Sequence, residues 1–277
     1  MTTHGERGLG VARAALRLFV LLLFVAPLAF SVSGSLRGLG GAPPAGFEVI
    51  PTGAGFAAYR HLADHFPVSI FLRNSLLVVL VAVPVTVLTA SWMGFALAQL
   101  PRRSRGLLIW LTIAMLMVPV PVLWIPRFIG YLHIGLLDSL VPLMAPAIAG
   151  TTPFTVLLAY RSFRKVPIEM FEAARAEGAG AIRTWWKVGL PRVGATTTAI
   201  AAIAFTVHWG NYFDALLYIG KESRKTLPLG VGRLASLAPG DLPIMLAGAF
   251  VLTVPPLLAL MLAQKRLLSS VDSAVAH

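Results

Sequence analysis

The chain has 277 residues, of which 57% are hydrophobic and 12% are charged, and its mean hydropathy is +0.80. Soluble domains are usually about a quarter charged, so the composition indicates a surface that largely faces lipid, and the lack of cysteine excludes disulfides and thiolate metal sites. The net charge of +12 does not indicate nucleic-acid binding, because the basic residues lie in short connectors between apolar runs.

The N-terminal region predicts a first membrane span. Residues 1–17 form a polar arm, and the uncharged run 18–36 is about long enough to cross the hydrocarbon core at 1.5 Å per residue. A cleaved signal peptide is the alternative, since a basic arm followed by an apolar run is common to both. The run is longer than most signal-peptide cores, which favours a span.

The connector 37–73 contains two histidines four residues apart, with an aspartate beside them. His61 and His65 would face the same side of a helix and could share a metal with Asp64. No glutamate follows His61, so this is not the HExxH pattern of zinc proteases. We expect a solvated helix here and no metal site.

Five more uncharged runs follow, separated by short polar connectors. The third predicted span contains Pro119, Pro121 and Pro126, which can kink a membrane helix where neighbouring segments satisfy the freed carbonyls. The sequence therefore predicts an all-α membrane protein with one transmembrane domain, residues 18–267, and a cytoplasmic tail, residues 268–277. The expected spans are residues 18–36, 74–100, 106–126, 139–160, 193–213 and 242–264.

Six spans place both termini on one side of the membrane, and the basic residues divide unequally between the two sides. The richer side has fifteen: Arg7, Arg13, Arg17, Arg102, Arg103, Arg105, Arg161, Arg164, Lys165, Arg175, Arg183, Lys187, Arg192, Lys265 and Arg266. The other has eight: Arg37, Arg60, Arg73, Arg127, Lys221, Arg224, Lys225 and Arg233. Cytoplasmic loops are enriched in Lys and Arg, so both termini and residues 167–191 are predicted to be cytoplasmic.

Residues 167–191 are unusually charged for this chain and predict a helix, a tight turn and a second helix. Pro167 suits a helix start, Gly178 and Gly180 suit a C-cap and turn, and Pro191 is expected to end the second helix. Six residues recur at helical spacing and would share one face of a continuous helix: Ile168, Phe171, Ala174, Gly178, Ile182 and Trp185. The simplest interpretation is an ordinary amphipathic hairpin between two spans.

The same segment resembles the EAA loop in the membrane subunits of ATP-binding-cassette importers. The resemblance rests on Glu172-Ala173-Ala174, Gly178, Val188 and Leu190-Pro191, and it departs only at Val188, where isoleucine is more usual. In that family the loop is cytoplasmic and docks into a groove on the ATPase. The resemblance implies a type I importer transmembrane domain. It also implies ATPase-coupling residues: Glu172, Ala173, Ala174, Gly178, Leu190 and Pro191.

Other segments resemble the permeases of carbohydrate importers, in particular the maltose-type second permease. These are Gly135-Leu136-Leu137-Asp138, Thr226-Leu227-Pro228-Leu229-Gly230 and the segment 209–213, in which Gly210 intrudes between Trp209 and Asn211. Aromatic rings can stack on sugars, and an amide both donates to and accepts from hydroxyls. Trp209, Asn211 and Tyr212 are therefore the candidate solute-path residues, although aromatic residues near a span end are often interfacial.

No GxxxxGK[ST] loop is present, so the chain is expected to have no catalytic site, cofactor or metal of its own. The resemblance implies that ATP and Mg belong to a partner. The implied partners are a second permease subunit, two ATP-binding-cassette ATPases and an extracytoplasmic solute-binding protein, in a prokaryotic inner membrane. Two alternatives remain open: an importer of a peptide, amino acid or phosphate ester, and a membrane scaffold that transports nothing.

Overall fold

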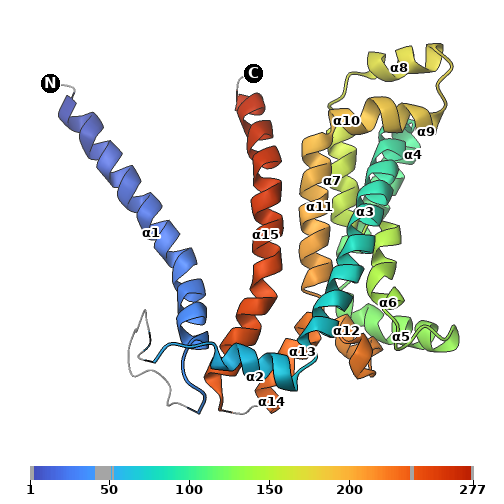
Figure 1. The fold of residues 1–277 in the computed structure, drawn as a ribbon. Helices are drawn as coiled ribbons and strands as arrows, with labels where there is room; N and C mark the ends of the chain where they lie inside the picture. The colour runs from blue at the N-terminus through green and yellow to red at the C-terminus, as the bar shows by residue number, and fades with distance from the viewer. Residues whose placement is uncertain (1–2, 41–50, 52, 238–239, 276–277) are drawn as a thin grey trace. The chain divides into compact units, whose positions relative to one another are not determined.

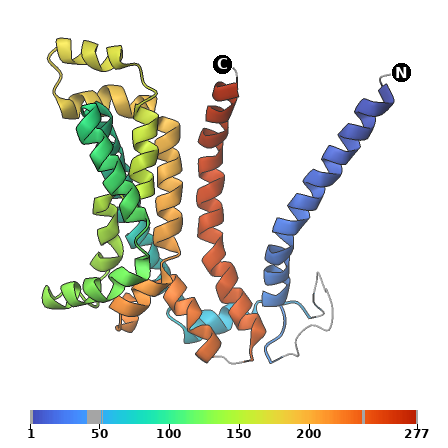
Figure 2. The same cartoon turned by 180° about the vertical axis from the view of Figure 1, so that it is seen from behind.

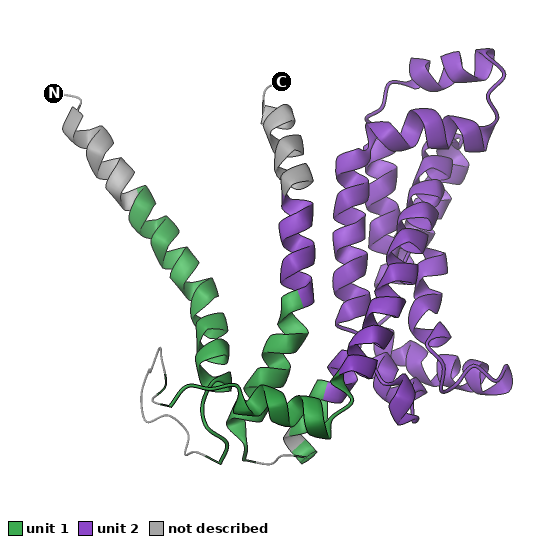
Figure 3. Ribbon diagram, viewed as in Figure 1, with its two compact units in different colours: residues 1–68, 231–254 green, residues 69–230, 255–277 purple. Residues whose placement is uncertain are grey.

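The computed structural model describes residues 3–40, 51, 53–237 and 240–275, and this part of the chain contains helices and no strand (Figure 1). The chain divides into two compact units, residues 1–68 with 231–254 and residues 69–230 with 255–277 (Figure 3). The all-helical membrane fold predicted from the composition is confirmed.

The first unit contains helices α1 (Thr3–Ser35), α2 (Ala57–His65) and α14 (Leu234–Leu237), with the first part of α15 (Leu242–Val275). Its core is a small apolar cluster made by Ala58, Leu62, Leu234, Ile244 and Ala247. The hydroxyl groups of Ser35 and Tyr59 lie 2.7 Å apart and join the end of α1 to α2. His61 and His65 lie on α2, where their rings stack with centroids 4.1 Å apart.

The N-terminal arm and the C-terminal tail are both helical where they are described. Helix α1 already begins at Thr3, and α15 continues through Val275. Residues 1–2 and 276–277 of the predicted arm and tail lie outside the described residues, as do residues 41–50 of the connector.

In the second unit long helices lie side by side, with short helices at both ends (Figures 1 and 2). The long helices are α3 (Val68–Gln99), α4 (Arg102–Leu116), α7 (Pro153–Phe163) and α11 (Gly194–Trp209). One end carries α8 (Ile168–Ala176), α9 (Ala181–Thr184) and α10 (Leu190–Arg192), and the other carries α5 (Trp124–His133) and α12 (Tyr212–Tyr218).

Helices α3 and α7 cross very closely because α3 has a glycine at the crossing point. A Cβ atom on Gly94 would lie 2.5 Å from the Cβ atom of Ala159, which is shorter than any ordinary contact. Beside this crossing, the Phe95 ring packs edge-on against the rings of Phe163 and Phe171 at centroid distances of 5.5 and 5.6 Å. This aromatic cluster is the main core of the second unit.

The third predicted span is broken rather than kinked. Helix α4 ends at Leu116, and a short 3₁₀ turn at Val120–Leu123 leads into α5. The segment Val120–His133, which contains this turn and α5, is inclined by 92° to α4. Pro119 and Pro121 lack the N–H group that a continuing helix would need, so the helix ends before them. Residues 106–126 therefore do not form one helix.

The fourth predicted span also changes course. Helix α6 (Val141–Met144) continues as a 3₁₀ turn (Ala145–Ala149), and α7 begins after Gly150 and Thr151, both of which have positive φ, +77° and +65°. By length and hydropathy, four helical segments of the described chain are able to cross a membrane. The number rises to six if each of two sharply bent pairs counts as one span.

Candidate functional site

The hairpin 167–191 turns at a Schellman motif that depends on Gly178. The N–H groups of Gly178 and Ala179 donate to the carbonyl oxygens of Arg175 and Ala174, each at 2.9 Å. Gly178 has φ +77°. Glycine adopts this left-handed backbone at little cost, so the turn predicted at this residue is confirmed.

One face of α8 anchors the hairpin in the aromatic core. Phe171 is 1% exposed and Ala174 is also buried, as is Trp185 after the turn. The guanidinium group of Arg175 donates to the side-chain oxygen of Gln99 at the end of α3. The hairpin is therefore held both by apolar packing and by a polar contact.

The predicted apolar face is only partly buried. Ile182 is exposed because the chain reverses direction at Gly178, so the second helix does not continue the face of the first. Ile168, the first residue of α8, is also exposed. The prediction that all six residues share one face of a continuous helix therefore overestimates the buried surface.

The opposite face of α8 is open. Glu172 and Ala173 are exposed, as are Glu169 and Ala176 one turn to either side. Small side chains at 173 and 176 let another backbone approach closely, and the two carboxylates supply negative charge. This face of α8 is therefore available to a partner.

The second half of the hairpin contains a π-helical turn, which the sequence did not predict. Residues Trp185–Gly189 form this turn, and the N–H of Leu190 donates to the carbonyl oxygen of Trp185. Pro191 does not end the helix as predicted, but lies inside the short helix α10 that follows. The wider turn changes the backbone pairing ahead of Pro191, so the missing N–H is tolerated. Leu190 is half-buried and Pro191 is exposed.

The chain bends by 89° after this helix and enters α11. The three solute-path candidates lie at the far end of α11. Trp209 is 4% exposed, and its ring stacks on Phe205 with centroids 5.6 Å apart. Asn211 and Tyr212 are half-buried.

Asn211 caps helix α12. Its side-chain oxygen accepts from the backbone N–H of Asp214 at 3.3 Å, and its amide nitrogen donates to the Asp214 carboxylate at 3.1 Å. The Asp214 carboxylate is buried in the second unit. The amide predicted to meet solute therefore already has partners within the protein.

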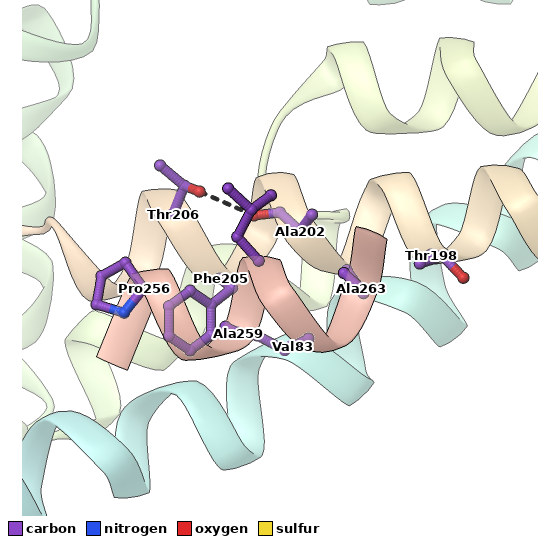
Figure 4. A pocket seen from close by; sticks show the side chains of 10 residues that line it. Val83, Thr198, Ala202, Phe205, Thr206, Pro256, Ala259 and Ala263 are labelled. Atoms are coloured by element: carbon purple, nitrogen blue, oxygen red, sulfur yellow. Dashed lines mark hydrogen bonds between the residues drawn. The ribbon is translucent and has the colours of Figure 1, made fainter. Parts of the chain in front are cut away.

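A mostly apolar groove of about 220 Å³ runs along α11 (Figure 4). Its walls come from Val83 of α3, from α11 and from the part of α15 that belongs to the second unit. The α11 wall includes Phe205, which stacks on Trp209, and the hydroxyl-bearing Thr198 and Thr206. Phe205 therefore separates the groove from Trp209, the nearest solute-path candidate.

A buried polar chain, absent from the predicted site, lies between α3, α6 and α11. His208 Nε2 lies 2.9 Å from the hydroxyl oxygen of Thr151, which lies 2.5 Å from the hydroxyl oxygen of Thr86. His208 Nδ1 lies 3.0 Å from the carbonyl oxygen of Leu143. A histidine inside an uncharged run is a signal that could have singled it out, because polar groups inside a membrane tend to be paired or functional.

A second polar contact joins two connectors. Asp138 Oδ1 accepts hydrogen bonds from the backbone N–H groups of Gly220 at 2.6 Å and Lys221 at 2.9 Å. These donors, that of Lys221 foremost, hold the pKa of the Asp138 carboxyl below its ordinary value. The N–H of Asp138 donates in turn to the carbonyl oxygen of Tyr218.

The architecture is that of a membrane permease of the ATP-binding-cassette importer class. Residues 83–268 match the family described as the inner membrane component of binding-protein-dependent transport systems. The match covers more than half of the chain, and the chain belongs to this family.

Named relatives come from several transport systems. A putative ABC transporter permease protein, ORF1, of Streptomyces antibioticus is 31% identical over 79% of this chain and 96% of its own length. The lactose transport system permease protein LacG of Rhizobium radiobacter is 26% identical, over 80% and 81% respectively. The sn-glycerol-3-phosphate transport system permease protein UgpE of Yersinia pestis is 30% identical, over 72% and 71%.

The fold is also that of a solved importer. A chain in the crystal structure of a bacterial ABC transporter involved in the import of the acidic polysaccharide alginate matches with a TM-score of 0.74. The match covers 94% of this chain and 97% of that chain, at 21% identity.

Proposed function

We propose that the chain is the permease subunit of an ATP-driven, binding-protein-dependent importer of a sugar or sugar derivative. The observation that carries the proposal is the hairpin with one face buried in the permease core and one face open, in a chain of this family. The permease names of relatives such as LacG support a carbohydrate solute.

In this proposal, the open face of α8 docks on a partner ATPase. Glu172 pairs with a basic or donor group across the interface, while Ala173 allows close approach. Ala174 packs in the core and Gly178 forms the turn, so both stabilise the hairpin without contacting the ATPase. Leu190 and Pro191 connect the hairpin to α11. Because Phe171 and Arg175 fasten α8 to the end of α3, a displacement of α8 would be passed on to the long helices.

The solute path is proposed to run past the far end of α11. Asn211 and Tyr212 are half-buried and are the candidates for direct contact. Trp209 is buried against Phe205, so it would support the path wall rather than touch solute in this conformation.

The remaining parts of the machine are supplied by partners. ATP and Mg bind to two ATPase subunits, a second permease completes the path, and an extracytoplasmic binding protein delivers the solute. The excess of basic residues on one side supports cytoplasmic termini and a cytoplasmic hairpin in the inner membrane.

A phosphate ester is the second candidate solute. One relative, UgpE, is named as an sn-glycerol-3-phosphate transport permease and is 30% identical to this chain. The same fold and hairpin would serve that solute equally well, since neither feature recognises the cargo.

Purification of the tagged chain from its native membranes tests the proposal. We expect an ATP-binding-cassette ATPase and a second permease to copurify with it. ATP-loaded vesicles containing this complex and its binding protein should then take up an oligosaccharide in preference to sn-glycerol-3-phosphate. Consistent absence of an ATPase would contradict the transporter assignment, and the reverse preference would favour the phosphate ester.

A further inference from the structure

A second surface on the hairpin combines exposed apolar and basic side chains. Trp186 is 53% exposed and Ile182 is 68% exposed, and they lie four residues apart. Arg183 and Lys187 follow each of them directly and are also exposed. Apolar and cationic side chains are therefore paired along α9 and the π-helical turn.

These four residues line an open depression with Trp92 of α3, Gly180 and Ala181. Trp92 precedes the end of α3 at Gln99 by seven residues, which corresponds to roughly 10 Å along the helix axis. A position at this depth from a span end is where tryptophan meets the headgroup region of a bilayer. With α3 as a spanning helix, this distance corresponds to the expected height of the lipid headgroups.

The aromatic wall of the depression is held from behind. The ring of Trp185 packs edge-on against Trp92 at 5.3 Å and against Trp186 at 5.5 Å. Trp185 itself is buried. Trp92 and Trp186 are therefore positioned by a shared buried neighbour, so the apolar wall is preformed.

The basic side chains are not used within the described chain. Across those residues, neither Arg183 nor Lys187 makes an ion pair or a side-chain hydrogen bond. No acidic residue lines the depression. Two uncompensated cations next to an apolar wall are complementary to an amphiphile with an anionic head.

We propose that this surface binds an anionic phospholipid. The phosphate group lies between Arg183 and Lys187, and an acyl chain lies against Trp186 and Trp92. Such a lipid would tie the second half of the hairpin to the membrane and leave the open face of α8 free. The proposal does not depend on which solute or ATPase the chain serves.

Fluorescence quenching by brominated lipids tests this site. The full-length chain in an uncharged detergent is titrated with brominated phosphatidylglycerol or brominated phosphatidylcholine, and tryptophan emission is recorded. We expect a preference for phosphatidylglycerol on the order of tenfold, falling as salt is added. In Arg183→Gln/Lys187→Gln the ratio of the affinity for phosphatidylglycerol to that for phosphatidylcholine should approach one.

Two controls separate the site from general charge. Lys221→Gln/Arg224→Gln removes the same charge from an exposed connector and should keep the wild-type ratio. Arg183→Lys/Lys187→Arg keeps both cations and should also have the wild-type lipid affinity ratio. Trp186→Ala keeps the charges but should reduce quenching by phosphatidylglycerol.

An unchanged lipid preference in Arg183→Gln/Lys187→Gln would overturn the proposal. If that variant instead loses a copurifying protein while its lipid ratio stays at the wild-type value, the surface is a protein interface. If Arg183→Gln/Lys187→Gln loses its helical circular dichroism, Trp186→Ala decides, and unaltered quenching in that variant overturns the proposal.

Discussion

The imidazole of His208 and the hydroxyl of Thr151 lie 2.9 Å apart, and this contact joins α11 to the break ahead of α7. The other ring nitrogen of His208 faces the Leu143 carbonyl oxygen at 3.0 Å. Since a carbonyl can only accept, Nδ1 donates there. Both bonds hold the irregular backbone of the fourth predicted span, where Thr151 has a left-handed conformation.

We expect His208→Leu to lower the stability of the permease. Interhelical hydrogen bonds in membranes contribute about 0.6 kcal/mol on average and up to about 1.7 kcal/mol, so the loss of two predicts about 1–3 kcal/mol. Thermal unfolding in detergent measures the change. Thr206→Val is the matched control on the same helix, because its hydroxyl donates only to Ala202 within α11. Equal unfolding temperatures for wild type and His208→Leu would contradict the argument.

Asn211 has two proposed roles, capping α12 and contacting solute, and two substitutions separate them. Asn211→Ser keeps a cap acceptor but loses the amide donor, whereas Asn211→Leu loses both. If Asn211 contacts solute, both variants should lower uptake. Asn211→Leu should lower the unfolding temperature more than Asn211→Ser does, because it also loses the cap, which is typically worth about 1 kcal/mol. Normal uptake by a stable Asn211→Ser would show that the residue is a cap alone.

The hairpin shows how far local sequence patterns reach. The turn at Gly178 and the burial of Phe171 and Ala174 follow from glycine chemistry and helical spacing. The exposure of Ile182 and the π-helical turn do not, because both depend on how the chain returns to α11 after it has reversed. A periodicity extends only as far as its helix does.

The breaks in the spans were partly visible in the sequence. Pro119 and Pro121 indicated a disturbance, but a right-angle change of direction depends on the packing of α5 against α12 rather than on proline alone. The left-handed Thr151 could not be predicted, since β-branched residues rarely adopt positive φ. Its partner His208 was visible as a polar residue in an apolar run, but no sequence rule pairs the two.

Membrane orientation can be measured without removing any native cysteine, since the chain has none. Glu177→Cys places a thiol on the exposed turn of the hairpin, and Ser223→Cys places one on the connector predicted to lie on the other side. In intact cells, we expect an impermeant maleimide to label Ser223→Cys and not Glu177→Cys. Labelling of Glu177→Cys from outside would invert the topology and exclude a cytoplasmic ATPase as its partner.

The contact between Asp138 and the connector after α12 predicts a pH-dependent contribution to stability. The backbone donors of Lys221 and Gly220 hold the folded-state pKa of Asp138 below its ordinary value of 3.8. The ionised carboxylate therefore stabilises the fold above pH 3.8, and this contribution is lost as the pH falls through the lower folded-state value.

Asp138→Asn should accordingly unfold at a lower temperature than wild type at pH 6, and the difference should shrink as the pH falls below about 4. Asp64→Asn is the control, because Asp64 is exposed on α2 and makes no hydrogen bond or ion pair within the described chain. A difference that stays constant from pH 6 to pH 3 would show that charge on Asp138 is not the cause.

The Schellman turn of the hairpin makes the clearest prediction about coupling. At Gly178 no heavy atom lies within 4 Å of the position that a Cβ would occupy, so a side chain there meets no clash and the only cost is the positive φ. A β-branched residue at φ +77° costs about 1–3 kcal/mol, whereas asparagine tolerates this region better. We therefore expect Gly178→Val to lower the affinity of the permease for its ATPase by up to about 100-fold, and Gly178→Asn to lower it less.

Gly180→Val is the matched control for this turn. Gly180 has an ordinary φ of −66° and likewise has open space around its Cβ position, so the same substitution two residues later should cost little. ATPase retention and ATP-dependent uptake are measured on the same reconstituted sample, with limited proteolysis of the hairpin as a report on its local order. Gly178→Val should be cleaved faster than Gly180→Val and should hydrolyse ATP with less solute moved. If the two variants retain ATPase and couple equally well, the left-handed turn does not determine docking, and the match to the importer loop at Gly178 carries no functional weight.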